Sequence, residues 1–213
     1  MSYEFAAKIW SFKQTIAGAE RALRHYVRRL TITLPQEPRI LDAGCGTGTM
    51  GLAFLEKHPT ARVVETDFST DMLRHVERRA VRLDPGLARV IIGQGDIQSP
   101  DHVRILSSGQ EIILGPETFD LVIAGAVLEH VDIERSLTGL TALVRKGGFL
   151  LINLMQENLF TKISRSLYGF HFLDPQGVVM RLRNLGYSSV EIVPFSFSEF
   201  PMNIYRVGIL CQR

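Results

Sequence analysis

A glycine-rich turn carries the residue types that bind a small charged ligand. The segment 39–51 reads RILDAGCGTGTMG, which predicts a buried strand, a tight turn and a helix from Met50 to about Glu56. Gly44, Gly46 and Gly48 lack a Cβ atom, so the backbone can bend sharply and a ligand can approach its N–H groups. The first amides of the following helix then favour an anionic group on that ligand.

Two classes of ligand compete for this turn, and Asp42 distinguishes between them. Gly46, Gly48 and Gly51 match the G-x-G-x-x-G pattern of dinucleotide-binding loops. Asp42 would repel a pyrophosphate and attract an ammonium group. The residues therefore favour a zwitterionic amino-acid tail, with its amine toward Asp42 and the Gly44 carbonyl, and S-adenosylmethionine carries such a tail. A strand-to-helix turn without a ligand is the structural alternative.

A second acid follows the next predicted strand, RVVETD, at 62–67. Asp67 lies 19 positions after Gly48, close to the offset of about 20 at which a βαβ unit brings a carboxylate to a ribose diol. The aromatic ring of Phe68 can cover an adenine face, and Ser69 can cap the next helix, which runs through Arg79. We expect Asp67 and Phe68 to bind the nucleoside half of the ligand.

A third acid ends the predicted strand at 91–97. Asp96 can accept a hydrogen bond from the adenine amino group, while the backbone N–H of Ile97 can donate one to the adjacent ring nitrogen. Aspartate at this position is also typical of a turn or a helix cap, so that alternative stays open.

Two histidines are candidate general bases. His130 follows a fourth predicted strand at 119–125, and an imidazole with a pKa of about 6.5 can accept a proton at neutral pH. A capping or packing role beside Glu129 is the alternative. His171 is a second candidate in the aromatic segment 160–172, which forms either a wall of the acceptor pocket or core packing under a loop.

The elements that must position these residues alternate between strand and helix. A fifth strand is predicted at 148–154, then a helix from Asp174-Pro175 to about 185, and a final antiparallel pair of strands at 189–193 and 205–210. A small hairpin is predicted between Asp96 and Phe119. The segment 4–30 predicts helices broken near Ala17-Gly18. This order is typical of a doubly wound α/β sheet.

Five segments resemble, in order and near the usual spacing, the motifs of the class I S-adenosylmethionine-dependent methyltransferases. They are DAGCGTGTMG, VVETDFSTDML, GQGDIQ, FDLVIAGAVLEHV and LVRKGGFLLIN, and together they cover about 39–153. The resemblance implies a Rossmann-like, seven-stranded, mostly parallel sheet with helices on both faces and an N-terminal helical cap. It implies S-adenosylmethionine contacts at Asp42, Gly44, Gly46, Asp67, Asp96 and the Ala124 backbone. Cys45, in the glycine turn, is expected to pack against the ligand.

Length and composition favour one domain without a nucleic-acid partner. We expect residues 1–34 to form the helical cap, 35–154 the cofactor-binding core and 155–213 the substrate-side loop, helix and final strands of a single methyltransferase domain. A net charge of +2 is too small to indicate nucleic-acid binding by itself. Two cysteines, the lack of a secretory leader and the lack of a membrane-length apolar run favour a cytoplasmic location.

The predicted function is methyl transfer to a small, partly hydrophobic acceptor. The segments 3–10 and 168–175 loosely resemble small enzymes that methylate metabolites, quinone precursors or lipid-like acceptors, and this resemblance supports that class of acceptor. No metal site is expected, because the fourth strand ends without carboxylates and no zinc-ligand spacing occurs. A nicotinamide-dependent oxidoreductase and a non-catalytic binding module or partner subunit are the alternatives. The basic helical region at 4–30 can cap the fold or lie on an anionic membrane surface.

Overall fold

The computed structural model describes residues 18–157 and 172–213. The first part of the predicted helical cap, the candidate base His171 and most of the aromatic segment 160–172 lie outside the described residues.

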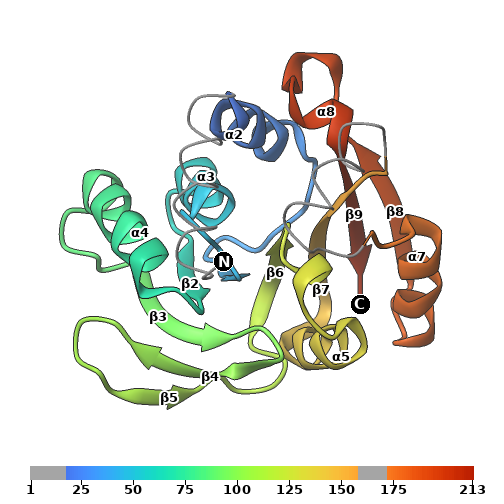
Figure 1. Cartoon of the computed structure of the whole chain (residues 1–213). Coiled ribbons are helices and arrows are strands. Elements are labelled where there is room, and N and C mark those ends of the chain that lie inside the picture. Colours follow the sequence, from blue (N-terminus) through green and yellow to red (C-terminus); the bar gives the residue numbers. More distant parts are fainter. Residues whose placement is uncertain (1–17, 158–171) are drawn as a thin grey trace.

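A sheet of nine strands in the order β5-β4-β3-β2-β1-β6-β7-β9-β8 crosses the molecule (Figure 1). Strands β3, β2, β1, β6 and β7 are parallel to one another, whereas β9 is antiparallel to both of its neighbours. The strands are β1 (Arg39–Ala43), β2 (Arg62–Asp67), β3 (Val90–Asp96), β4 (Ser99–Ile105), β5 (Glu111–Ile113), β6 (Phe119–Gly125), β7 (Val144–Met155), β8 (Ser189–Pro194) and β9 (Arg206–Gln212).

The prediction of seven strands is wrong, because the predicted hairpin joins the sheet. Strands β4 and β5 form that hairpin, and β4 pairs antiparallel with the edge strand β3, with Gly93 opposite Ile105. Gly93 makes this close approach feasible, since an added Cβ would lie 2.3 Å from a methyl group of Val103. The buried Val103 side chain thus fills the space that a larger residue would occupy.

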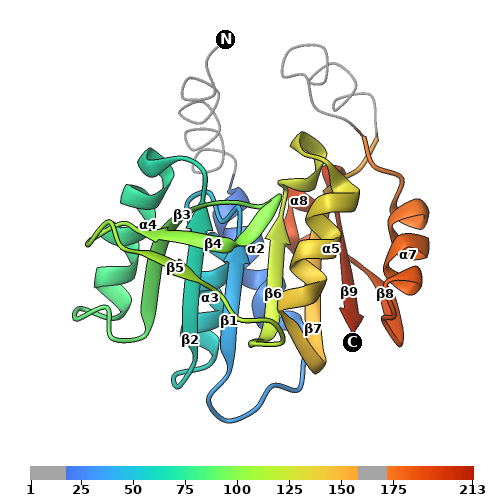
Figure 2. The ribbon, with the colours of Figure 1, turned by 90° about the horizontal axis from the view of Figure 1, so that it is seen from below.

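Helices cover both faces of the sheet (Figure 2). Alternate residues of β1 point to opposite faces: Ile40 packs with α2, α3 and α4, and Leu41 packs with α5 and α7. The helices are α2 (Ala19–Arg29), α3 (Thr49–Lys57), α4 (Thr70–Leu83), α5 (Ile133–Leu143), α7 (Pro175–Asn184) and α8 (Met202–Tyr205), with short 3-10 turns η1 (Leu128–His130) and η2 (Phe197–Glu199). The Rossmann-like α/β class predicted from the sequence is confirmed.

Local signals set where these helices begin. Ser69 caps α4 by accepting from the Met72 amide, and Asp174 caps α7. Helix α2 starts directly after Gly18, whose φ of 70° is left-handed and lies outside the α-helical range. Within the described residues, no helix has both the length and the apolar composition needed to cross a membrane.

Candidate functional site

The glycine loop, defined here as residues 44–48, connects β1 to α3. Gly44, Gly46 and Gly48 adopt φ values of 68°, 55° and 71°, a left-handed region that disfavours residues with a Cβ atom. A Cβ added to Gly44 would lie 2.6 Å from a methyl group of Val127, which follows β6. Glycine is therefore required both for the bend and for the close contact between this loop and the segment after β6.

Asp67 joins the glycine loop to the end of β2. Its Oδ2 accepts from the Gly46 amide at 2.8 Å, and its Oδ1 accepts from the Ser69 amide at 2.8 Å. Each carboxylate oxygen retains a second lone pair, so the side chain can still accept from a diol. Phe68, the next residue, is 62% exposed.

A buried acidic cluster, formed by Asp42, Glu65 and Asp67, lies beneath the glycine loop. Asp42 and Glu65 are paired in register on β1 and β2, and Asp42 Oδ2 accepts from the Gly51 amide at 2.8 Å. Asp42 thus satisfies an amide in the first turn of α3 from below. Sequence reasoning missed Glu65, although an acid that directly follows two valines inside the predicted strand was a usable signal.

Burial changes the protonation of these acids. It raises the pKa of Asp42 to about 7, against the stabilising hydrogen bond from Gly51. Burial, followed by the neighbouring Asp42 charge, raises the pKa of Glu65 well above its usual range. Burial also raises the pKa of Asp67, opposed by its two amide hydrogen bonds. Burial, followed by the nearby acidic groups Glu65, Asp67 and Asp42, raises the pKa of the Cys45 thiol, which is consequently neutral at physiological pH.

Asp96 and Ile97 occupy the end of β3. The Asp96 side chain is exposed, and its Oδ1 accepts from the Gln98 amide at 2.9 Å. This is the turn geometry named as its structural alternative, and it leaves further acceptor capacity on the carboxylate. Ile97 is buried and packs with Leu41 and Val122.

The segment after β6 holds Ala124 and His130. Ala124 is fully buried, so its predicted contact with a ligand would be made by its backbone. Ala126, two residues later, has a φ of 62°, a strained value for a residue with a Cβ atom. His130 ends η1 and is exposed to solvent. Its neighbour Glu129 is instead buried.

Glu129 anchors this segment to the last strands. Its Oε1 accepts from the Met155 amide at 2.6 Å and from Arg206 Nη1 at 3.0 Å. Sequence reasoning missed this ion pair because its members are 77 residues apart. The nearby Asn153 side chain, also missed, donates to the Met50 sulfur at 3.0 Å and links β7 to α3.

The parallel strands bring most of the predicted residues to one edge. Asp67, Asp96 and Ala124 lie at or near the carboxyl ends of β2, β3 and β6, and the glycine loop follows β1. In open α/β sheets, ligands bind at this edge. Among residues 18–157 and 172–213, no group of three or more His, Cys, Asp or Glu side chains is placed to hold a metal ion.

Comparison with known proteins places the chain in a family. The family model of the methyltransferase domain matches residues 41–150, just over half of the chain. A malonyl-[acyl-carrier protein] O-methyltransferase of Magnetococcus marinus is 27% identical over 134 residues, which is 62% of this chain and 44% of that protein. The enzyme of the same name from Halalkalibacterium halodurans is 30% identical over 156 residues, 72% of this chain and 52% of that protein.

A solved structure has the same fold. Magnesium protoporphyrin IX methyltransferase from Synechocystis PCC 6803, determined with bound SAH, matches with a TM-score of 0.68 and 18% identity, covering 92% of this chain and 84% of that one. The chain spans about half the length of the two curated relatives. With the family match over 41–150 and the shared fold, the chain belongs to the methyltransferase-domain family.

Proposed function

We propose that the chain is an S-adenosylmethionine-dependent methyltransferase that acts on a small, partly hydrophobic acceptor. The observation that carries this proposal is the buried acidic cluster beneath the glycine loop. A ligand that brings a cationic amine and sulfonium would favour the ionised form of these carboxyl groups, whereas a pyrophosphate would add further negative charge beside them. Membership of the methyltransferase-domain family supports the same choice.

The residues present fit this cofactor. The Gly44 backbone and the Gly46 carbonyl would face its amino-acid tail, since the Gly46 amide already donates to Asp67, and Cys45 would pack beside it. Asp67 would accept from the ribose hydroxyls with the lone pairs that its amide hydrogen bonds leave available. Phe68 would cover the adenine, while Asp96, the Ile97 amide and the Ala124 backbone would contact the adenine edge and the cleft wall.

When bound, S-adenosylmethionine supplies a methyl group already activated by its positive sulfur. The chain then mainly has to align the acceptor atom with that methyl group and exclude water. His130 would accept a proton from an acceptor that must lose one. His171 is proposed as a second candidate for this role. Two relatives are named O-methyltransferases, which supports an oxygen atom as the nucleophile.

The proposal extends to the organisation of the chain. Residues 1–213 would act as one domain, with 1–34 as a cap, 35–154 as the cofactor-binding core and 155–213 on the acceptor side. No nucleic-acid partner is proposed, in keeping with a net charge of +2. We also propose a cytoplasmic location. Contact of α2 with an anionic membrane stays a prediction, which co-sedimentation with phosphatidylserine vesicles tests.

Calorimetry and methyl transfer test the function together. S-adenosylhomocysteine should bind the full chain with micromolar or tighter affinity, and NADH should not bind. Incubation with methyl-labelled S-adenosylmethionine and a metabolite extract should then yield a labelled small molecule, identified by mass. Binding of NADH alone would indicate an oxidoreductase, and cofactor binding without any labelled product would indicate a non-catalytic module.

A further inference from the structure

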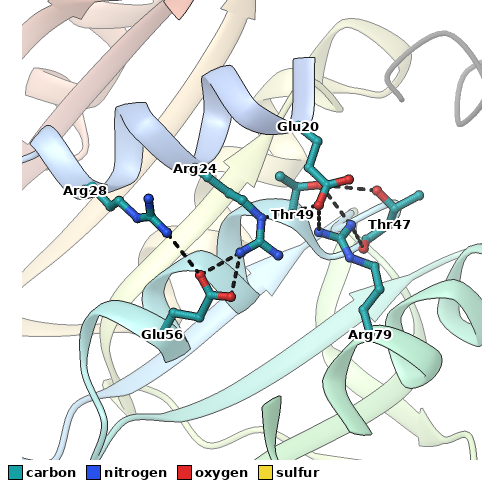
Figure 3. A network of polar contacts seen from close by, with 7 residues as sticks. All are labelled: Glu20, Arg24, Arg28, Thr47, Thr49, Glu56 and Arg79. Carbon is teal, nitrogen blue, oxygen red and sulfur yellow. Dashed lines mark hydrogen bonds and ion pairs between the residues drawn. The ribbon is translucent and has the colours of Figure 1, made fainter. Parts of the chain in front are cut away.

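A polar network connects the start of α2 to the back of the glycine loop (Figure 3). Resting on the proposed function, we propose that Arg79 and Glu20 are positioning residues for the cofactor site: Arg79 holds the glycine loop in its ligand-binding shape, and Glu20 holds Arg79. Neither residue belongs to the motifs that indicated the family. Both lie outside the sequence segment that forms the loop itself.

Arg79 contacts the glycine loop directly. From α4, its Nη1 donates to the Thr47 carbonyl at 2.7 Å and to the Thr49 hydroxyl at 3.1 Å. Thr47 lies between Gly46 and Gly48, two residues whose backbones have wide conformational freedom. Fixing the Thr47 carbonyl therefore restricts the part of the loop with the largest entropy to lose on ordering.

Glu20 provides the charge that Arg79 needs in this position. The Arg79 side chain is only 18% exposed, and its Nη2 donates to Glu20 Oε1 at 2.7 Å. Burial lowers the pKa of Arg79, and the charge of Glu20 is the first to oppose that effect. Without Glu20, the half-buried guanidinium would lose its ion-pair partner, and its hydrogen bond to the Thr47 carbonyl would weaken.

Helix α2 also provides a control, through its contact with α3. Arg24 of α2 donates through Nη1 to both oxygens of Glu56, at 2.5 and 2.6 Å, and Arg28 lies 3.8 Å from the same carboxylate. Glu56 is near the far end of α3, away from the loop at its start. This second ion pair ties α2 to α3 and meets the first at Glu20, where Arg24 Nε donates to Oε1 at 3.3 Å, but among the described residues neither Arg24 nor Glu56 hydrogen-bonds to the glycine loop.

The inference is tested first without ligand, by hydrogen exchange on the full chain. Glu20→Gln should speed exchange of the Gly46 and Gly48 amides, whose acceptors are Asp67 and the Cys45 carbonyl, by about tenfold. Glu56→Gln should leave those two amides unchanged. Unchanged exchange in Glu20→Gln, or equal acceleration in both variants, would overturn the inference.

A second measurement follows binding of S-adenosylhomocysteine by calorimetry. Glu20→Gln should weaken binding roughly fivefold and Arg79→Ala roughly tenfold, whereas Glu56→Gln should stay within about twofold even if its melting temperature falls equally. The double variant Glu20→Gln with Arg79→Ala should be no weaker than Arg79→Ala alone, because Glu20 acts through Arg79. Fully additive losses would contradict that coupling. A wild-type chain that fails to bind overturns the proposed function, and the exchange comparison still decides the role of the network.

Discussion

At the scale of single residues, Asp67 combines a structural and a proposed binding role. Each of its oxygens accepts a hydrogen bond from a backbone amide, one in the glycine loop and one at the start of α4. Those contacts orient the carboxylate before any ligand arrives, so little side-chain entropy remains to be lost on binding. A ribose diol would then meet a preoriented acceptor.

Replacing Asp67 should therefore weaken cofactor binding. Asp67→Ala should reduce the affinity for S-adenosylhomocysteine by about 10- to 100-fold, since hydrogen bonds to a charged group contribute on the order of 1.5–3 kcal/mol. Calorimetric titration measures this change. Asp71→Asn is the control, because Asp71 on α4 pairs with Arg74 at the surface and should leave the affinity unaltered. Equal affinity of Asp67→Ala and wild type would reject the ribose assignment.

His130 is proposed to act on the acceptor and not on the cofactor. His130→Ala should slow methyl transfer by roughly 10²- to 10⁴-fold, the range typical of a positioned general base, with unchanged S-adenosylhomocysteine affinity. Transfer of labelled methyl to the identified acceptor is the measurement. His75→Ala, an exposed histidine on α4, serves as the control. If His130→Ala turns over as fast as wild type, His130 has a structural role only.

Asp42 links stability to pH. Its pKa is about 7 in the folded chain against 3.8 for the free group. Between these values the folded chain retains a proton that the unfolded chain releases, so the stability contributed by Asp42 falls as pH rises from about 4 through 7. Asp42→Asn keeps an oxygen acceptor for Gly51 and removes this titration.

The variant should match wild type near pH 4 and exceed its free energy of unfolding at pH 8 by up to about 4 kcal/mol. Urea denaturation at several pH values measures the difference. Parallel stability curves for Asp42→Asn and wild type would show that burial does not perturb this carboxyl.

At the scale of elements, α3 is shaped by the acids beneath it. The helix begins over β1 and β2, and Gly51 in its first turn faces the Asp42–Glu65 pair. A Cβ at Gly51 would lie 2.3 Å from Glu65 Oε1 and 3.0 Å from the Asp42 Cβ. The third glycine of the G-x-G-x-x-G pattern is therefore explained by helix-to-sheet packing.

Gly51→Ala should destabilise the chain although alanine is the better helix former. Helix propensity would favour alanine by about 1 kcal/mol, whereas overpacking against buried carboxyls should cost about 2–3 kcal/mol more than that gain. Gly177→Ala in α7 is the control, because its Cβ would meet only the flexible Arg181 tip at 3.2 Å and the Asp174 cap at 3.3 Å. The melting temperature measured by thermal unfolding should fall for Gly51→Ala and not for Gly177→Ala. A Gly51→Ala variant more stable than wild type would contradict the packing argument.

At the scale of the whole molecule, α2 connects distant parts of the sheet. Its first half reaches α3 and α4 through Arg24 and Glu20, as Figure 3 shows. Its second half reaches the C-terminal strands, where Tyr26 stacks on Phe195 with ring centroids 4.1 Å apart. One helix thus spans the glycine loop and the β8–β9 edge, which supports the proposal of a single domain.

Glu199 is the main polar partner of α2 at the C-terminal side. Its carboxylate accepts from Arg29 Nε at 2.9 Å and contacts His25 Nδ1 at 3.0 Å. Burial alone would raise the pKa of Glu199, but the hydrogen bonds from Arg29 and the Ser196 amide outweigh it and lower that pKa. The resulting stabilisation is present above the unfolded-state pKa and is lost as pH falls through the lower folded-state pKa.

Glu199→Gln should lower the free energy of unfolding by about 2 kcal/mol at pH 7, with a smaller loss below about pH 4. Chemical denaturation at both pH values is the measurement. Glu191→Gln, an exposed acid on β8, should change stability by less than about 0.5 kcal/mol. A loss for Glu199→Gln that does not depend on pH would argue against the lowered pKa.

Much of this architecture is local and was therefore predictable from the sequence. The strand boundaries at 62–67 and 119–125, the Ser69 and Asp174 caps and the turn at Gly44 follow from period, capping and glycine chemistry within a few residues. The seven-strand count was wrong because an edge hairpin joins a sheet only when a partner strand such as β3 is there to pair with it.

The sequence by itself determined the order of strands and helices and the glycine loop, because short-range periodicity and backbone stereochemistry encode them, and its five motifs indicated the family by resemblance. Only the tertiary structure decided which acids share the space beneath that loop, and that Glu20 meets Arg79 across 59 residues and Glu129 meets Arg206 across 77. Such contacts depend on strand register and helix packing, which no local pattern in one chain specifies.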